Sequence, residues 1–425
     1  MFLGEGQSRR LRKFARRARR EILNVAIPPA RSRTLDATDR VRVVGLLSSA
    51  SGIGNSARLN AAALRSDGVA VEATNVAAYF SADDGLPFGP VQASAQASAT
   101  CSIYHLNPPM LVRGFLASGL RRYYASYNIG YWAWELETVP PEWRRAIDYI
   151  DAILVPTRFC ADATAKVTRK PVLVVPHPVT QGHAGLVRRS ANDGDKPFTV
   201  FGVFNFGSSF ERKNPVALIN AFKLAFGVQE PARLILKTSD GSRYPGDLDR
   251  LRRAIGDHPN IEVIDAVWSE AQMQQAFADA DAYISLHRSE GFGLSIAEAI
   301  MQETPVVATA WSGNIDFCHP SATYLVDYKL VPFRDEHGDY SEITAARWAE
   351  ASPEHASRLL RSIFERPADA RANAIEARQY LETHLERRTY IAALEQLKSS
   401  SAVVAAADPK PQPTVAAADS QVQNR

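Results

Sequence analysis

The sequence predicts an α/β protein built from two doubly wound domains of similar size. Along residues 41–175, short β-branched apolar runs alternate with helical patterns. A polar, glycine-containing stretch at 180–196 interrupts this alternation, and a second series starts afresh at Phe198. Such an order is typical of βαβ units on a parallel sheet, and here it occurs twice. The length of 425 residues agrees, because roughly 150 residues per domain gives two to three domains.

The first half contains six short apolar runs that we interpret as strands. They are Val41–Leu47, Val69–Thr74, Cys101–His105, Tyr127–Trp132, Ala152–Val155 and Val172–Val175. Helical patterns occur between them at Asn55–Ser66, Glu142–Tyr149 and Arg158–Val167. The stretch Gly89–Thr100 is rich in Ala and Ser and predicts a surface loop.

The second half repeats the alternation. Its predicted strands are Phe198–Phe204, Arg233–Lys237, Ile261–Ile264, Ala282–Leu286, Val306–Ala308 and Thr323–Val326. Its predicted helices are Pro215–Phe226, Gly246–Ile255, Glu270–Ala278 and Leu294–Met301, and residues 345–397 are expected to be almost entirely helical.

These patterns give the expected domain boundaries. Residues 1–37 form a basic arm, 38–180 an N-terminal Rossmann-like domain, 181–196 a linker and 197–385 a C-terminal Rossmann-like domain. We expect a helix at 386–398 to cross back to the N-terminal domain. Residues 399–425 lack aromatic residues, Leu, Ile and Gly, so they cannot bury enough apolar area to order, and we expect a disordered tail.

The arm has the pattern of a cationic amphipathic helix over residues 9–25. Leu11, Phe14, Ala18, Ile22 and Val25 line one helical face, opposite the arginines. Residues 1–33 carry a net charge of +8, which leaves −5 on the remainder. The arm suits an anionic membrane surface, and the alternatives are a solvated basic tail, an organellar transit peptide or an RNA-binding arm. The mildly acidic body argues against nucleic acid as a partner.

Cysteine usage and hydropathy limit the location of the protein. Cys101, Cys160 and Cys318 lie far apart, which fits a reducing cytoplasm and argues against a structural zinc site. No run approaches the roughly 18 to 20 apolar residues of a membrane-spanning helix. We therefore expect a cytoplasmic protein, held peripherally on the cytoplasmic face of the inner membrane if the arm binds lipid.

The strongest chemical signal is a glycine turn between a strand and a helix, flanked by Glu290 and Glu298. Backbone N–H groups at the helix start suit a phosphate. Glu298 lies about 6 Å further along the helix, where a carboxylate could accept hydrogen bonds from a ribose diol. This spacing fits a sugar, a diphosphate and a ribose laid in sequence, and the plainer alternative is a strand–turn–helix unit with solvated glutamates. The expected donor-binding residues of the turn are Gly291, Phe292, Gly293 and Leu294.

This stretch, SEGFGLSIAEAI followed by TPVVATAWSGNIDF, resembles the retaining glycosyltransferases of family 4, which have the GT-B fold. FNFGSSFERKNP at 204–215 resembles the family's phosphate-contacting loop, and residues 45–58 resemble its N-terminal glycine loop. NIGYWAWELETVPPEW, followed by DAILVPTRFCADA, resembles a bacterial polysaccharide and lipopolysaccharide subgroup. The resemblance spans residues 41–397.

The resemblance implies transfer of a hexose-type sugar from a nucleotide-sugar donor on the C-terminal domain. The acceptor, a glycan or a lipid-linked molecule, would bind mainly the N-terminal domain. No metal or other cofactor is implied, because cationic side chains and helix dipoles balance the diphosphate, and the sequence has no DxD triplet near a strand end. Arg212 and Lys213 are the candidate cations. Many members carry another Arg where this chain has Gly207. The alternative for the two cations is a solvated helix start, although cations there oppose the helix dipole.

Other candidates have weaker support. Gly52 and Gly54 follow a strand and could contact the donor from the opposite domain, or form only a tight turn. His105 ends a strand, and the resemblance implies a contact with the transferred sugar. Trp134 and Glu135 could bind the acceptor, because aromatic faces pack against sugars, or could belong to the core. We expect His177 to be structural. The expected catalytic residues are therefore Glu290, His105, Arg212 and Lys213.

Two other functions are alternatives to a glycosyltransferase. A GT-B-like epimerase or phosphorylase would not explain the two glutamates eight residues apart. A catalytically inactive sugar- or nucleotide-binding scaffold would not need all of Glu290, Glu298, Arg212 and Lys213. Release of a nucleoside diphosphate from nucleotide sugars discriminates between these alternatives.

Overall fold

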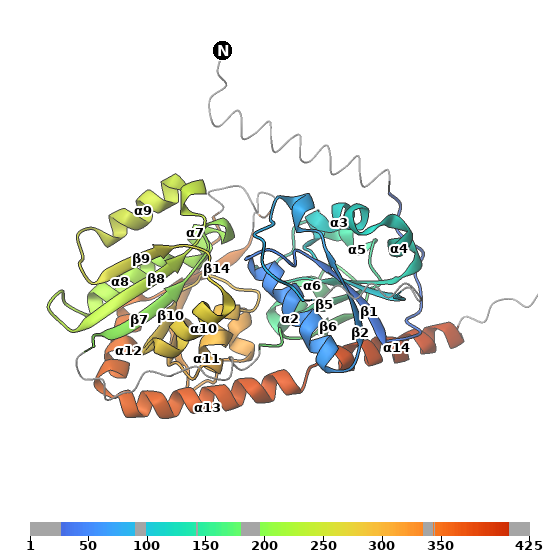
Figure 1. Ribbon diagram of the computed structural model, residues 1–425. Helices are drawn as coiled ribbons and strands as arrows, with labels where there is room; N and C mark the ends of the chain where they lie inside the picture. The colour runs from blue at the N-terminus through green and yellow to red at the C-terminus, as the bar shows by residue number, and fades with distance from the viewer. Residues whose placement is uncertain are drawn as a thin grey trace, which may run out of the picture.

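The computed structural model describes residues 27–89, 99–141, 143–179, 196–334, 343 and 345–407. Two α/β domains lie side by side, and each is built on a six-stranded sheet (Figure 1). All the strand pairs in both sheets are parallel. The predicted fold class, two doubly wound domains facing a central cleft, is confirmed.

The N-terminal sheet has the strand order β2-β1-β3-β4-β5-β6. Its strands are β1 (Arg40–Gly45), β2 (Ala70–Asn75), β3 (Cys101–His105), β4 (Tyr127–Tyr131), β5 (Ala152–Val155) and β6 (Val172–Val174). Every residue of β3, β4 and β5 is buried, because helices cover both faces of the sheet. The α-helices are α2 (Gly52–Ser66), α3 (Leu111–Ser118), α4 (Leu120–Ala125), α5 (Trp143–Ile147) and α6 (Arg158–Ala165), with 3₁₀ turns η1 (Ala77–Phe80) and η2 (Pro108–Met110).

The C-terminal sheet has the order β12-β11-β10-β7-β8-β9. Its strands are β7 (Phe198–Val203), β8 (Ala232–Thr238), β9 (Ile261–Asp265), β10 (Ala282–Ser285), β11 (Val306–Thr309) and β12 (Tyr324–Val326). The intervening helices are α7 (Phe210–Lys213), α8 (Pro215–Ala225), α9 (Pro245–Ile255), α10 (Glu270–Asp279) and α11 (Leu294–Met301), with 3₁₀ turns η3 (Phe206–Ser208), η4 (Gly241–Arg243) and η5 (Gly313–Asp316).

One expectation for this domain was wrong. Residues 345–397 are not almost entirely helical, because β14 (Arg347–Ala351) pairs antiparallel with β13 (Tyr328–Pro332). The sequence RWAEA has no strong strand preference. Pairing with β13 and burial of Trp348 and Ala349 impose the extended form.

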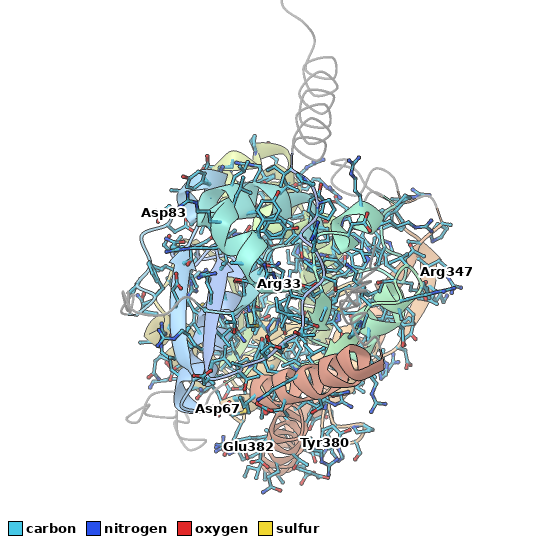
Figure 2. All side chains as sticks on the ribbon, turned by 90° about the vertical axis from the view of Figure 1, so that its right-hand side faces the viewer. Arg33, Asp67, Asp83, Arg347, Tyr380 and Glu382 are labelled. Carbon is cyan, nitrogen blue, oxygen red and sulfur yellow. The ribbon has the colours of Figure 1, made fainter. Side chains whose placement is uncertain are left out.

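The chain then returns to the N-terminal domain. Helices α12 (Pro353–Glu365) and α13 (Pro367–Glu386) belong to the C-terminal half, and α14 (Tyr390–Ala407) lies across the N-terminal domain (Figures 1 and 2). Tyr390, Leu394 and Leu397 are buried in the N-terminal core. The helix ends at residue 407, so residues 399–407 are not the disordered segment that was expected. They are mainly Ser, Val and Ala, and alanine has the highest helix propensity. The rest of the expected tail lies outside the described residues.

The N-terminal domain begins earlier than the expected boundary at residue 38. Ile27 and Leu35 are buried in its core. The Tyr149 hydroxyl donates to the Ile27 carbonyl at 3.1 Å, and the Ala30 N–H donates to the Tyr123 hydroxyl at 2.8 Å. The predicted amphipathic helix at 9–25 lies outside the described residues, as does residue range 181–195 of the expected linker. Within the described part of the chain, none of the helices combines the length and apolar character needed to cross a bilayer.

Candidate active site

A cleft of about 1760 Å³ separates the two domains. Its lining includes residues at or just after the carboxyl ends of strands from both sheets. His105 ends β3, Tyr131 ends β4 and Val203 ends β7, while Glu290 follows β10. Parallel α/β sheets bind ligands at this edge, so the cleft is the candidate site.

The loop between β10 and α11 is held in one conformation by the loop after β11. The Ser312 hydroxyl accepts from the Glu290 N–H at 2.8 Å, and the Gly313 N–H donates to the Glu290 carbonyl at 2.9 Å. A Cβ atom on Gly313 would lie 2.3 Å from the Gly291 carbonyl oxygen, so only glycine fits there. Gly293 precedes α11 with φ +95°, a conformation that favours glycine. The first turn of α11 therefore presents its N–H groups to the cleft.

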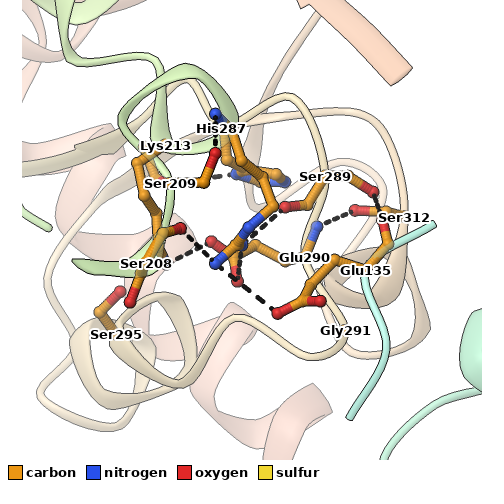
Figure 3. A network of polar contacts seen from close by, with 12 residues as sticks. Glu135, Ser208, Ser209, Lys213, His287, Ser289, Glu290, Gly291, Ser295 and Ser312 are labelled. Atoms are coloured by element: carbon orange, nitrogen blue, oxygen red, sulfur yellow. Dashed lines mark hydrogen bonds and ion pairs between the residues drawn. The ribbon is translucent and has the colours of Figure 1, made fainter. Parts of the chain in front are cut away.

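Glu290 makes ion pairs with both candidate cations, and Figure 3 shows the network of polar contacts around it. Its carboxylate is 3.0 Å from Arg212 Nη1 and 2.5 Å from Lys213 Nζ. Arg212 Nη2 lies 3.7 Å from Glu135 of the N-terminal domain. The two cations and Glu290 of the C-terminal domain therefore meet Glu135 of the N-terminal domain beside the glycine turn.

The guanidinium of Arg212 also holds the surrounding backbone. It donates to the Ser289 carbonyl at 3.0 Å and to the Ser208 carbonyl at 2.9 Å, and the side chain is 5% exposed. Arg212 and Lys213 are the last two residues of the one-turn helix α7, directly before Asn214, the residue that precedes α8. Ser209 begins this helix because its side chain accepts from the Arg212 N–H. The two cations are therefore not solvated as the alternative required, since Arg212 is 5% and Lys213 18% exposed and both pair with Glu290.

The electrostatics of this cluster follow from burial and charge. Burial alone would raise the pKa of Glu290, but Lys213 and Arg212 outweigh it and lower the pKa to about 2. Burial lowers the pKa of Lys213, and Glu290 opposes that effect. Burial also raises the pKa of Glu135, against the pull of Arg212. Glu290 is therefore ionised at neutral pH.

Glu298 lies one turn further along α11 and meets the opposite domain. Asn55 of α2 donates its side-chain amide to Glu298 Oε1 at 3.3 Å. Burial raises the pKa of Glu298 to about 7, and the negative charge of Glu270 acts in the same direction. The carboxylate is therefore poorly satisfied by protein groups, as expected for a group that accepts hydrogen bonds from a ligand.

His105 is fully buried at the end of β3 but lines the cleft. Its Nδ1 is 2.9 Å from the Ser56 hydroxyl, and its ring stacks on Tyr131 with centroids 4.5 Å apart. Within the described part of the chain, its Nε2 has no hydrogen-bond partner. Burial lowers the pKa of His105 well below its usual range, so the imidazole is neutral. A neutral ring with one unpartnered nitrogen can exchange a hydrogen bond with a ligand hydroxyl. His177 has a similar environment: burial lowers its pKa to about 3, and its Nδ1 is 3.1 Å from the Tyr131 hydroxyl.

The two glycines of the N-terminal turn differ. Both lie in the first turn of α2, where Ser51 caps the helix by accepting from the Gly54 N–H. A Cβ atom on Gly54 would lie 2.5 Å from the Ser49 carbonyl oxygen, so packing requires this glycine. A Cβ atom on Gly52 would meet nothing within 4 Å, and Gly52 lines the cleft. Only Gly52 is therefore placed where a ligand could approach.

Trp134 and Glu135 take different roles. The Trp134 indole is buried, lies 4.4 Å from the Trp143 ring and donates to the Thr138 carbonyl at 2.8 Å. This packing fits the alternative of a core residue, but Trp134 also lines the cleft, and its contact with the acceptor stays a prediction. Glu135 faces Arg212 in the cleft, and its carbonyl accepts from the Ser289 hydroxyl. A Cβ atom on Gly291 would lie 3.1 Å from the Trp134 backbone, so Gly291 permits the close approach of the two domains.

Sequence reasoning missed the residues that join the domains at the site. Thr157 Oγ1 donates to the Gly291 carbonyl at 2.8 Å, and Asn55 reaches Glu298. The Arg158 N–H donates to Asp316 at 2.7 Å. Thr157 had a local signal, because it is a cap residue before a helix, and the structure shows that its hydroxyl also accepts from the Cys160 N–H. A contact with a loop 134 residues away leaves no local signal.

Comparisons with known proteins agree with this architecture. Residues 201–337 match the family model described as glycosyl transferases group 1, which is less than half of the chain. The match lies within the C-terminal domain. None of the curated proteins matches the chain by sequence.

Solved structures show the same fold at low sequence identity. Sucrose-phosphate synthase from Thermosynechococcus elongatus is 14% identical with a TM-score of 0.58, over 87% of this chain and 100% of that one. HepE from Anabaena, in complex with UDP and glucose, is 14% identical with a TM-score of 0.55, over 87% and 99%. TarM from S. aureus is 12% identical with a TM-score of 0.49 over 72% of this chain, and the chain spans 56% of its length. At these identities the likeness shows the fold, which is GT-B.

Proposed function

We propose that this protein is a retaining glycosyltransferase that moves a hexose-type sugar from a nucleotide-sugar donor to a glycan or lipid-linked acceptor in cell-surface polysaccharide synthesis. The observation that carries the proposal is the cluster at the start of α11. Arg212 and Lys213 flank Glu290 there, and Glu298 lies one turn further along the helix. The glycosyl transferases group 1 match covers these residues.

The geometry suits a nucleoside diphosphate. The N–H groups at the start of α11 and the ammonium of Lys213 offer positive charge on one side of the cleft. Glu298 stands where the ribose hydroxyls of the same ligand would donate to it. The neighbour HepE was solved with UDP and with UDP-glucose, which supports a donor of this class.

In the proposed reaction the chain supplies position and charge. Lys213 and Arg212 stabilise the negative charge that develops on the leaving diphosphate. A diphosphate oxygen takes the proton of the attacking acceptor hydroxyl on the same face, so the anomeric configuration is retained. Glu290 and the neutral His105 hold sugar hydroxyls from the two domains, which keeps the anomeric carbon near the acceptor.

Cation-assisted departure of the diphosphate would need no metal ion, and metal independence stays a prediction. The described residues contain no group of three or more His, Cys, Asp or Glu side chains arranged to hold a metal. The proposed location is the cytoplasmic face of a membrane, with residues 9–25 as the contact, where nucleotide sugars and a lipid-linked acceptor would both be available.

Incubation with a panel of nucleotide sugars tests the proposal. We expect release of nucleoside diphosphate with one donor, and transfer with retention when the product anomer is determined by NMR. A product with inverted configuration would contradict the retaining mechanism. Nucleotide binding without turnover would favour an inactive scaffold, and conversion of the donor sugar without transfer would favour an epimerase.

A further inference from the structure

One part of the cleft lies outside the proposed donor-binding site. Its N-terminal side extends between η1, η2, α3 and α5, where cleft-lining residues come from 80–87, 107–113 and 140–149. We call these lining residues the acceptor recess. It opens into the same cleft as His105 and Glu135, so a ligand held there could reach the transferred sugar.

The wall of the acceptor recess is mainly apolar. It is formed by side chains that include Phe80, Leu86, Met110, Val112, Trp143 and Ala146. Trp143 is anchored by Trp132 and Trp134, with ring centroids 5.8 and 4.4 Å away. The uncharged polar residues of the lining are Ser81, Asn107 and Tyr149, so a glycan would bury most of its hydroxyl groups against the wall without partners, which costs free energy. The wall therefore favours a ligand with an apolar segment.

Two arginines supply the charge of the acceptor recess. Among the described residues that line it, Arg113 and Arg145 are the ionised side chains, and none is a carboxylate. The guanidinium of Arg113 lies 4.4 Å from the Phe80 ring centroid and donates to the Tyr79 carbonyl, so it is held at the rim. Arg145 is exposed on α5.

The helices around the recess have the same sign, whereas Asp83 and Asp84 belong to its 80–87 segment but lie outside the lining. Helices α3, α4 and α5 contain five arginines and no Asp or Glu. Besides the two recess arginines, these are Arg121, Arg122 and Arg144. Glu72 pairs with Arg122 at 3.2 Å, and Asp148 follows α5. An apolar wall with a cationic rim matches a ligand in which an apolar chain is joined to phosphate.

We infer that the acceptor recess binds a lipid phosphate- or diphosphate-linked sugar, with the lipid along the apolar wall and the phosphate at Arg113 and Arg145. This inference rests on the proposed function, because it assigns the acceptor of the same transfer. It chooses between the glycan and the lipid-linked acceptor that the sequence left open.

Farnesyl diphosphate is the probe, and its binding to the full chain is followed by calorimetry and tryptophan fluorescence. The double variant Arg113→Gln/Arg145→Gln should raise the Kd by about tenfold or more, as expected for lost charge-assisted contacts. Met110→Asp, which puts a carboxylate in the recess, should do the same. Arg121→Gln/Arg144→Gln is the matched control, because it removes the same charge from neighbouring helices outside the cleft lining. The control should bind like the parent protein.

Further binding measurements test which parts of the ligand the recess recognises. Farnesol and inorganic diphosphate should each bind much more weakly than farnesyl diphosphate, since each offers half of the recognised structure. Saturating nucleoside diphosphate should not displace the probe, and Lys213→Ala should retain probe binding, because both concern the donor side. Displacement by the nucleotide would place the probe in the donor site and overturn the inference.

A membrane phospholipid could present the same chemistry. Co-sedimentation with phosphatidylglycerol vesicles that falls equally in both double variants, without binding of farnesyl diphosphate, would indicate a general anionic-surface contact and overturn the inference. Nucleotide affinity and donor hydrolysis are measured on the same variants. If the parent protein binds nucleotide and hydrolyses the donor but does not bind farnesyl diphosphate, only the acceptor assignment is refuted, whereas a parent protein that does none of these refutes the proposed function.

Discussion

Replacing Glu298 by glutamine should stabilise the protein without ligand and weaken its affinity for ribonucleotides. The folded-state pKa of Glu298 is about 7, raised from 4.5 by burial and by Glu270. Between these values the folded state holds a proton that the unfolded state has released. Stability therefore falls as pH rises from 4.5 through 7, and the full cost of ionising Glu298 is present above pH 7.

The size of the effect follows from the shift. At about 1.4 kcal/mol per pKa unit, ionisation of Glu298 costs up to about 3.5 kcal/mol of unfolding free energy at pH 8. Glutamine is neutral, and its amide oxygen can still accept from Asn55, which now donates to Glu298 at 3.3 Å. Glu298→Gln should therefore recover stability at pH 8, up to about that amount, and change little near pH 4.

The same variant should lose a charged acceptor for the ribose. Such a hydrogen bond contributes about 1.5–3 kcal/mol, so the Kd for the nucleoside diphosphate should rise ten- to a hundredfold at pH 8. In the parent protein, affinity should fall below pH 7 as Glu298 is protonated. Glu298→Gln should lack this dependence on the carboxylate.

Urea denaturation at pH 4 and 8 measures the first effect, and calorimetry measures the second. The control ligand is the 2′,3′-dideoxy form of the same nucleotide, which cannot donate to Glu298 and should bind both proteins equally. Glu270→Gln is a second control, because removing its charge should lower the pKa of Glu298. An equal loss of affinity for both nucleotides, or no gain of stability at pH 8, would refute the reasoning.

Further predictions concern the rest of the cluster and the chain ends. Glu290→Gln should lower turnover while sparing affinity for nucleoside diphosphate, because Arg212 and Lys213 remain; a loss of affinity equal to that of Glu298→Gln would contradict the division of roles. Lys213→Ala should weaken diphosphate binding by about tenfold in calorimetry, whereas Arg212→Ala should also lower the melting temperature, because Arg212 holds the Ser208 and Ser289 carbonyls. EDTA should leave turnover intact, and activity restored only by Mg²⁺ or Mn²⁺ would argue against cation-assisted departure. Deleting residues 1–26 should preserve folding and weaken co-sedimentation with anionic vesicles, whereas deleting 1–33 should destabilise the domain, because Ile27 is buried.

The regular parts of the fold were predictable because the local pattern and the tertiary environment agree. β3 and β5 are short apolar runs buried on both faces, and their bounds match the prediction. The turn before α11 was predictable because Gly293 adopts φ +95°, a conformation that few other residues accept. At these positions the residue type alone indicates the local structure.

The parts that sequence reasoning missed depend on distant partners. β14 is extended because it pairs with β13, although its own residues favour no strand. Residues 27–37 join the N-terminal domain through Ile27, which is followed by two prolines, and Leu35, which occurs among polar residues, so neither belongs to a periodic pattern. The position of Arg212 depends on carbonyls at Ser208 and Ser289 and on Glu135 of the other domain. Contacts with distant residues determine each of these features, so local sequence propensity could not predict them.

The contacts across the cleft connect the two halves of the proposed reaction. The carbonyl of Gly291, in the donor loop, accepts from Thr157 of the N-terminal domain, and Glu298 accepts from Asn55. A carboxylate has two oxygens, so a ribose can donate to Oε2 of Glu298 while Asn55 still donates to Oε1. The Asn55 and Thr157 contacts would then both keep the donor loop against the N-terminal domain. The transferred sugar would stay between His105 and the acceptor recess, as a transfer between two bound substrates requires.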